Sequence, residues 1–192
     1  DTVLGEGVFD GCGALRSVTL PAQLTALPDR AFADCASLVD LTLPDSLTSI
    51  GENVFLGCSL LRSLTVPSGV TDLTPDLLTG LRLKEIFVAE NHPVYTSDGT
   101  TLLRTSDHAL IYTVRNTDET AFTVESGVTS IEDSAMEGCH RIRELTLPEG
   151  LVSIGDSALR GIGVTELWIP STVETIGDYA LADCDRLRSV YL

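Results

Sequence analysis

Apolar and polar residues alternate in short runs along the chain, and these runs return at a nearly fixed interval. The clearest run is Leu61-x-x-Leu64-x-Val66, in which Ser63 and Thr65 separate the apolar positions. Alternation with a period of two predicts a strand with one buried face. Equivalent runs predict strands near 17–21, 40–44, 63–67, 85–89, 121–125, 144–148, 166–170 and 189–192.

The segments between these strands also repeat. An apolar crossing segment follows each strand, and a short stretch that begins with an acid and ends at Gly or Asp comes next. Acids at the first positions fit the N-terminus of a short helical turn, and Gly or Asp at its end fits a left-handed cap. Pro28 occupies the site equivalent to Gly51, and proline cannot take positive φ, so this site does not require a left-handed residue. The cap positions are Gly11, Asp34, Gly57, Gly80, Gly138, Gly161 and Asp183.

The repeat length and its L-x-x-L-x-L core are typical of a leucine-rich-repeat solenoid. Pro21, Pro44 and Pro67 are 23 residues apart, for example. The sequence therefore predicts an α/β repeat solenoid, a right-handed coil with one parallel concave sheet and short helical turns on the other side. We expect a single domain over residues 1–192, with about eight coils. Both ends fall inside a repeat, which indicates a fragment of a longer chain.

The period is interrupted once, between Ala89 and Glu125. Residues 95–103 and 109–113 resemble strands, and Asp98-Gly99 and Ser106-Asp107 are turn signals. This pattern predicts a β-hairpin insert over residues 90–120.

The five cysteines occupy one phase of the repeat, where Leu81 and Ile162 also occur. Free exchange with aliphatic residues is typical of a buried apolar position. We therefore expect five buried, reduced and unreactive thiols: Cys12, Cys35, Cys58, Cys139 and Cys184.

The excess of acidic over basic residues excludes some classes of binding partner. The chain has 28 acidic and 12 basic residues, for a formal net charge of −16. Such a surface repels nucleic acid and anionic lipid. No apolar stretch has the roughly 18 residues of a membrane helix, so we expect no membrane insertion.

The sequence predicts no enzymatic activity, no bound metal and no cofactor. The sequence has no phosphate loop, nucleophile elbow or H-E-x-x-H motif. His92, His108 and His140 are isolated, and each is expected at the surface.

The repeat pattern resembles the BspA-like leucine-rich repeats of bacterial surface proteins. The resemblance rests on units such as residues 173–184 followed by Leu187-x-x-Val190, and on the insert with Val94-Tyr95 and Asp98-Gly99. It implies an extracellular or bacterial cell-surface adhesion module without shared catalytic residues. A passive structural spacer in a larger surface protein is the alternative.

One outward column of the predicted sheet contains three large aromatic residues, Phe87, Trp168 and Tyr191. The adjacent column contains Glu85, Glu144 and Glu166. Aromatic rings beside carboxylates fit a basic segment of a protein partner, from host matrix or a bacterial surface, or a glycan. These six residues are the predicted ligand-binding site. The alternative is that Trp168 and Tyr191 only cover one end of the solenoid.

Overall fold

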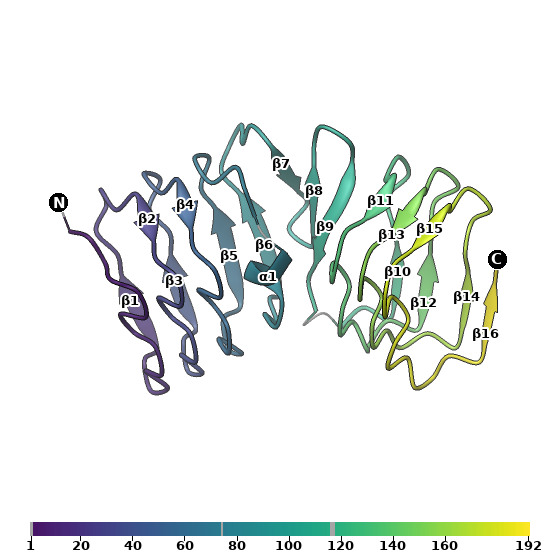
Figure 1. Ribbon diagram of the computed structural model, residues 1–192, viewed down its shortest axis with the longest axis horizontal. Helices are drawn as coiled ribbons and strands as arrows, with labels where there is room; N and C mark the ends of the chain where they lie inside the picture. Colours follow the sequence, from purple (N-terminus) through teal and green to yellow (C-terminus); the bar gives the residue numbers. More distant parts are fainter. Residues whose placement is uncertain (1, 74, 116–117) are drawn as a thin grey trace. The chain divides into compact units, whose positions relative to one another are not determined.

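The computed structural model describes residues 2–73, 75–115 and 118–192. The chain divides into two compact units, residues 1–100 and 101–192. In each unit, short parallel strands from successive coils lie side by side, as in a β-solenoid (Figure 1). Strands occur at all eight predicted positions.

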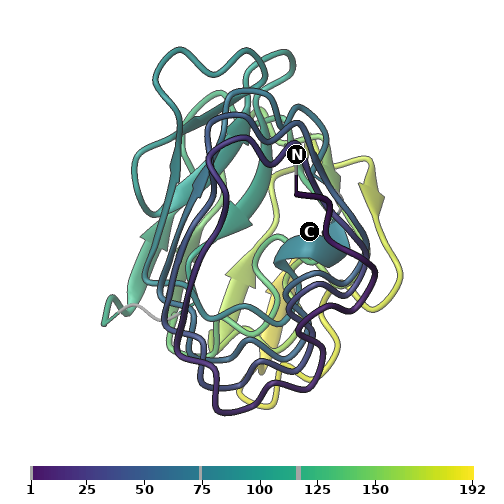
Figure 2. The ribbon, with the colours of Figure 1, turned by 90° about the vertical axis from the view of Figure 1, so that its left-hand side faces the viewer.

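Unit 1 has two faces with parallel strands. Figure 2 looks along this unit, and its purple and blue coils follow nearly the same outline. On the first face, β1 pairs with β3 and β5 pairs with β6, and on the second face β2 pairs with β4. The elements of unit 1 are β1 (Ser17–Thr19), β2 (Ala26–Leu27), β3 (Asp40–Thr42), β4 (Ser49–Ile50), β5 (Ser63–Val66), α1 (Pro75–Leu78), β6 (Glu85–Val88) and β7 (Tyr95–Ser97).

Unit 2 repeats this arrangement and adds a hairpin. On the first face β10 pairs with β12 and β14 pairs with β16. On the second face β11, β13 and β15 form a continuous parallel ladder. The elements of unit 2 are β8 (Thr101–Arg104), β9 (Ala109–Thr113), β10 (Ala121–Thr123), β11 (Ser130–Ile131), β12 (Glu144–Thr146), β13 (Ser153–Ile154), β14 (Glu166–Trp168), β15 (Thr175–Ile176) and β16 (Ser189–Tyr191).

The hairpin consists of β8 and β9, which pair in antiparallel register where the repeat is interrupted. β9 also pairs in parallel with β11, through Leu110 and Ile131. The hairpin therefore supplies the strand that precedes β11 on the second face of unit 2.

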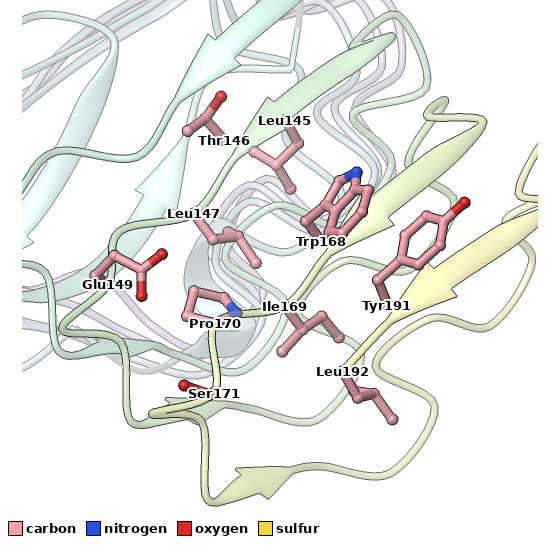
Figure 3. Close-up of a pocket in the computed structure, with 10 residues that line it drawn as sticks. All are labelled: Leu145, Thr146, Leu147, Glu149, Trp168, Ile169, Pro170, Ser171, Tyr191 and Leu192. Atoms are coloured by element: carbon pink, nitrogen blue, oxygen red, sulfur yellow. The ribbon is translucent and has the colours of Figure 1, made fainter.

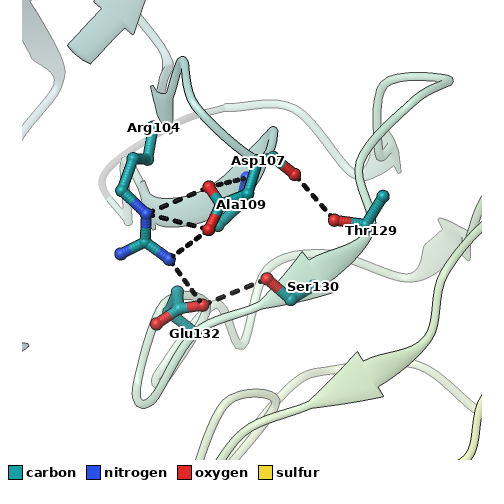
Figure 4. Close-up of polar contacts among 6 residues, drawn as sticks. All are labelled: Arg104, Asp107, Ala109, Thr129, Ser130 and Glu132. Carbon is teal, nitrogen blue, oxygen red and sulfur yellow. Dashed lines mark hydrogen bonds and ion pairs between the residues drawn. The ribbon is translucent and has the colours of Figure 1, made fainter. Parts of the chain in front are cut away.

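Side chains fasten the hairpin turn to the next coil (Figure 4). Arg104 contacts Asp107 at 2.8 Å and Glu132 at 3.3 Å. Thr129 donates to the backbone oxygen of Asp107, and Ser130 donates to Glu132. The hydrogen bonds from Arg104 lower the pKa of the Asp107 carboxyl.

The prediction of one continuous concave sheet is wrong. Among the described residues, the first face contains separate two-stranded ladders, and no ladder joins β3 to β5 or β12 to β14. Each strand has only three or four residues and therefore few ladder positions.

The prediction of short helical turns is also wrong, apart from the four residues of α1. The predicted left-handed caps are confirmed, but most turns contain a second left-handed residue four positions earlier. An α-helix cannot include such residues. The turn N–H groups instead donate to the next coil, as from Phe32 to Val54 at 3.0 Å. The second positions are Gly7, Arg30, Asn53, Ser134, Ser157 and Tyr179.

The acids that were expected at helix starts have a different role. Asp133 accepts a hydrogen bond at 2.8 Å from the backbone N–H of Asp156, one coil later. Asp156 accepts one from Asp178 at 2.7 Å, and Asp29 accepts one from Glu52 at 2.8 Å. These side chains link coils, and none of them caps a described helix.

The same links explain the glycines beside them. A Cβ on Gly155 would collide with the Asp133 carboxylate and lie 2.8 Å from its backbone nitrogen. Gly51 has the same collision with Asp29. The expectation that the Gly51 site does not require positive φ is confirmed, and the glycine is needed there for close approach instead.

The core consists of the inward residues of successive coils. Leu64 is 1% exposed, whereas Thr65 beside it faces outward. In unit 1, Phe32 stacks between Phe9 and Phe55, with ring centroids at 5.3 and 6.3 Å. The core thus runs along the stack of coils, so each coil buries its apolar residues against its neighbours.

The cysteines follow the prediction only in part. All five are free; Cys35, Cys58 and Cys139 are buried, Cys184 is half-buried and Cys12 is exposed. Burial raises the pKa of Cys58 to about 12 and that of Cys139 to about 11. The phase of the repeat is right, but Cys12 lacks the covering that the prediction assumed.

His92 is buried, so its predicted surface position is wrong. Nε2 lies 3.1 Å from the Pro67 oxygen and 3.2 Å from the Val70 oxygen. Nδ1 accepts from the backbone N–H groups of Val94 and Tyr95. The ring therefore joins the start of the insert to the preceding coil within unit 1. His108 and His140 are exposed, as expected.

Leu64→Ala should lower the free energy of unfolding by about 2–5 kcal/mol, through lost burial and a residual cavity. Thr65→Ala should change it by no more than about 0.5 kcal/mol, because its side chain faces solvent. Denaturant melts measure both. Equal losses for the two variants would contradict the register of β5.

Gly155→Ala should destabilise the protein by about 1–3 kcal/mol, because the new Cβ would force Asp133 and its backbone away. Gly150→Ala is the matched control, since a Cβ there has open space and its φ is not positive. Thermal melts of the two variants provide the comparison. Similar curves would show that the close approach between coils does not occur.

A chromogenic thiol reagent should label Cys12 rapidly in the native protein. It should label Cys35, Cys58 and Cys139 only after denaturation, because burial raises their thiol pKa values and blocks access. Mass spectrometry of the labelled peptides identifies each site. Native labelling of Cys58 as fast as that of Cys12 would contradict the assigned core.

Candidate functional site

The candidate site lies on the first face of unit 2, on β14 and β16. These strands pair in parallel, with Trp168 opposite Tyr191 and Leu167 opposite Val190. Alternation directs Leu167 into the core, where it is fully buried, and places Trp168 and Tyr191 outside. The register therefore brings two aromatic residues side by side on one surface.

The two rings are stacked. Their centroids are 3.9 Å apart and their planes differ by 13°. Trp168 is 66% exposed and Tyr191 is 39% exposed. The stack covers one face of the indole, and a large part of Trp168 remains in contact with solvent.

A pocket of about 520 Å³ lies beside this pair (Figure 3). It occurs where β12 and β14 are adjacent but not joined by a ladder. Its wall combines aromatic, aliphatic and hydroxyl-bearing side chains with the carboxylate of Glu149. The lining residues are Leu145, Thr146, Leu147, Glu149, Trp168, Ile169, Pro170, Ser171, Tyr191 and Leu192.

The predicted acidic residues of unit 2 lie on the same outward face. Glu144 precedes Thr146 by two positions on β12, and Glu166 precedes Trp168 by two positions on β14. Both are exposed. The structure thus places Glu144, Glu166, Trp168 and Tyr191 on one surface, although neither glutamate lines the pocket.

The other two predicted site residues, Glu85 and Phe87, lie on β6 in unit 1 and are exposed. The Phe87 ring packs over Gly99, where an added Cβ would lie 3.1 Å from a ring carbon. The Gly99 oxygen also accepts a hydrogen bond from Ile86. Phe87 therefore covers the turn before β8, a local packing role that column position alone did not indicate.

Sequence reasoning missed several residues of the pocket, chiefly Glu149, Pro170 and Ser171. They lie in the turns after β12 and β14, and a search restricted to outward strand positions omits them. The Pro that closes most strands was visible in the sequence. After β14 this proline is Pro170, which lines the pocket together with Ser171.

No group of three or more His, Cys, Asp or Glu side chains within the described ranges is placed to hold a metal ion. Within the same ranges, no helix is long and apolar enough to cross a membrane.

The family model described as the BspA type leucine rich repeat region matches residues 2–97 and 112–192, in six copies. The chain belongs to this family. No curated protein sequence matches it.

Solved structures show the same fold. A leucine rich cell surface protein from Faecalibacterium prausnitzii A2-165 has 29% identity and a TM-score of 0.77, and the match covers 96% of this chain and 55% of that one. A leucine-rich repeat protein from Eubacterium ventriosum ATCC 27560 has 22% identity and a TM-score of 0.83, with 98% and 56% covered. The pneumococcal vaccine antigen PcpA has 20% identity and a TM-score of 0.66, with 88% and 54% covered. The chain thus spans little more than half the length of each.

Proposed function

We propose that this chain is a non-catalytic adhesion module at the bacterial surface, which binds a protein partner through the outward face of β14 and β16. The observation that carries the proposal is the exposed, stacked pair of Trp168 and Tyr191 beside a pocket. Proteins of this repeat family bind proteins in general, and the relative from Faecalibacterium prausnitzii is named a cell surface protein. The repeat family and the name of this relative both support an extracellular or surface location.

The aromatic pair supports recognition for an energetic reason. A tryptophan that is two-thirds exposed leaves a large apolar area in water, and removing it from water is favourable. Trp and Tyr are enriched among the residues that contribute most to protein interfaces. Stacking on Tyr191 also fixes the indole before a partner arrives, which reduces the entropy lost on binding.

Substituting both aromatic residues, Trp168→Ala with Tyr191→Ala, should weaken adherence of the purified chain by about 30-fold or more, as expected for a pair of interface anchors. The melting temperature should remain nearly unchanged, since both side chains face solvent. Adherence is measured on immobilised extracellular-matrix extract and on intact bacterial cells.

Tyr179→Asn is the matched control. It removes a ring that is 75% exposed from a turn of the same unit, and Asn tolerates the left-handed backbone at that position. This variant should adhere like the wild type. If the double variant adheres like the wild type or unfolds β14 and β16, the proposed site is wrong. If the wild-type chain adheres to neither surface, the spacer role replaces adhesion.

A further inference from the structure

The charged side chains in and beside the pocket on this face are glutamates. Glu149 has the only charged side chain among the lining residues, and Glu144 and Glu166 lie on the same face. Among the described residues, no ion pair involves any of these three glutamates. Arg186 and Arg188 line a different hollow. The carboxylates beside the aromatic pair therefore have no cationic partner within the described protein.

The indole has one face available to a ligand. Trp168 lies between Thr146 and Tyr191 in Figure 3, and Tyr191 covers only the side toward β16. The short Thr146 side chain cannot cover the other side of the ring. Trp168 and Glu149 both line the pocket, and Glu149 lies on the opposite side of Trp168 from Tyr191 in the same view. An aromatic face and a carboxylate thus border the same space.

We infer that the partner inserts an arginine side chain from an extended basic segment into this pocket. This inference rests on the proposed function and names the chemistry of its partner. A guanidinium is planar and weakly hydrated, so it stacks on an indole face and donates hydrogen bonds to a carboxylate at the same time. The pocket volume of about 520 Å³ is enough for such a side chain and the adjoining backbone.

Two other ligand classes fit less well. An anionic segment would meet Glu149, Glu144 and Glu166 without a compensating cation from the lining. A sugar ring also stacks on indole, but it needs several polar side chains that converge on its hydroxyl groups. The lining supplies only Thr146, Ser171, Glu149 and the Tyr191 hydroxyl around an otherwise apolar wall. Charge complementarity therefore favours arginine.

Trp168 provides a direct readout, because it is the chain's only tryptophan. A short Gly/Ser peptide with two arginines should change the Trp168 fluorescence in a saturable way. The same peptide with glutamates, and a neutral oligosaccharide, should not. Binding of the arginine peptide should weaken as salt increases, because the contacts with Glu144, Glu149 and Glu166 are partly solvent-exposed.

Glu149→Gln combined with Glu166→Gln should weaken binding of the arginine peptide by about five-fold, from two partly exposed charge contacts. Glu174→Gln is the control. It removes the same charge from an exposed position next to β15, on the second face, and should leave the affinity unchanged.

The outcomes separate this inference from the proposed function. Saturable binding of the oligosaccharide without binding of the arginine peptide would overturn it in favour of a glycan. Equal binding of the arginine and glutamate peptides would overturn it as well, and so would an unchanged affinity in the Glu149 and Glu166 double variant. If the arginine peptide fails while the aromatic double variant still loses adherence, only the arginine assignment fails. Wild-type adherence by the aromatic double variant would instead overturn the proposed function.

Discussion

Backbone hydrogen bonding between successive coils is the constraint on which the structure depends. The strands are too short to be stable alone, and most turns send their N–H groups to the following coil and not into a helix. Every coil must therefore approach its neighbour at one spacing on several sides. The aspartate links, the glycines that make room for them and the stacked phenyl rings of unit 1 all satisfy this condition.

The periodic features of the fold could be predicted from sequence, and the features that depend on contact between coils could not. Leu64 and the left-handed cap at Gly57 follow from alternation and residue type. Asn53 and Tyr179 gave no such signal, because a left-handed residue that is not glycine looks like any polar or aromatic turn residue. The need for Gly155 became visible only beside the Asp133 side chain, one coil earlier.

The same division applies to the candidate site. Alternation correctly placed Trp168 and Tyr191 on the outside, and Leu167 and Ile169 inside. It could not reveal that the rings stack, since this depends on the register of β14 and β16 and on side-chain rotation. The pocket extends into the turns after β12 and β14, where alternation along the strands gives no information. Glu149 belongs to one of these turns and was therefore not among the predicted residues.

The two left-handed residues of a turn have a consequence for how such a protein diversifies. They hold the turn in shape with backbone conformation, whereas a strand position that faces solvent, such as Thr65, has no side chain in the core. Such an outward residue can therefore be exchanged without a change in the core. A new specificity can thus arise from a few outward substitutions that leave the interior intact, and outward residues of neighbouring coils can act as a pair, as Trp168 and Tyr191 do.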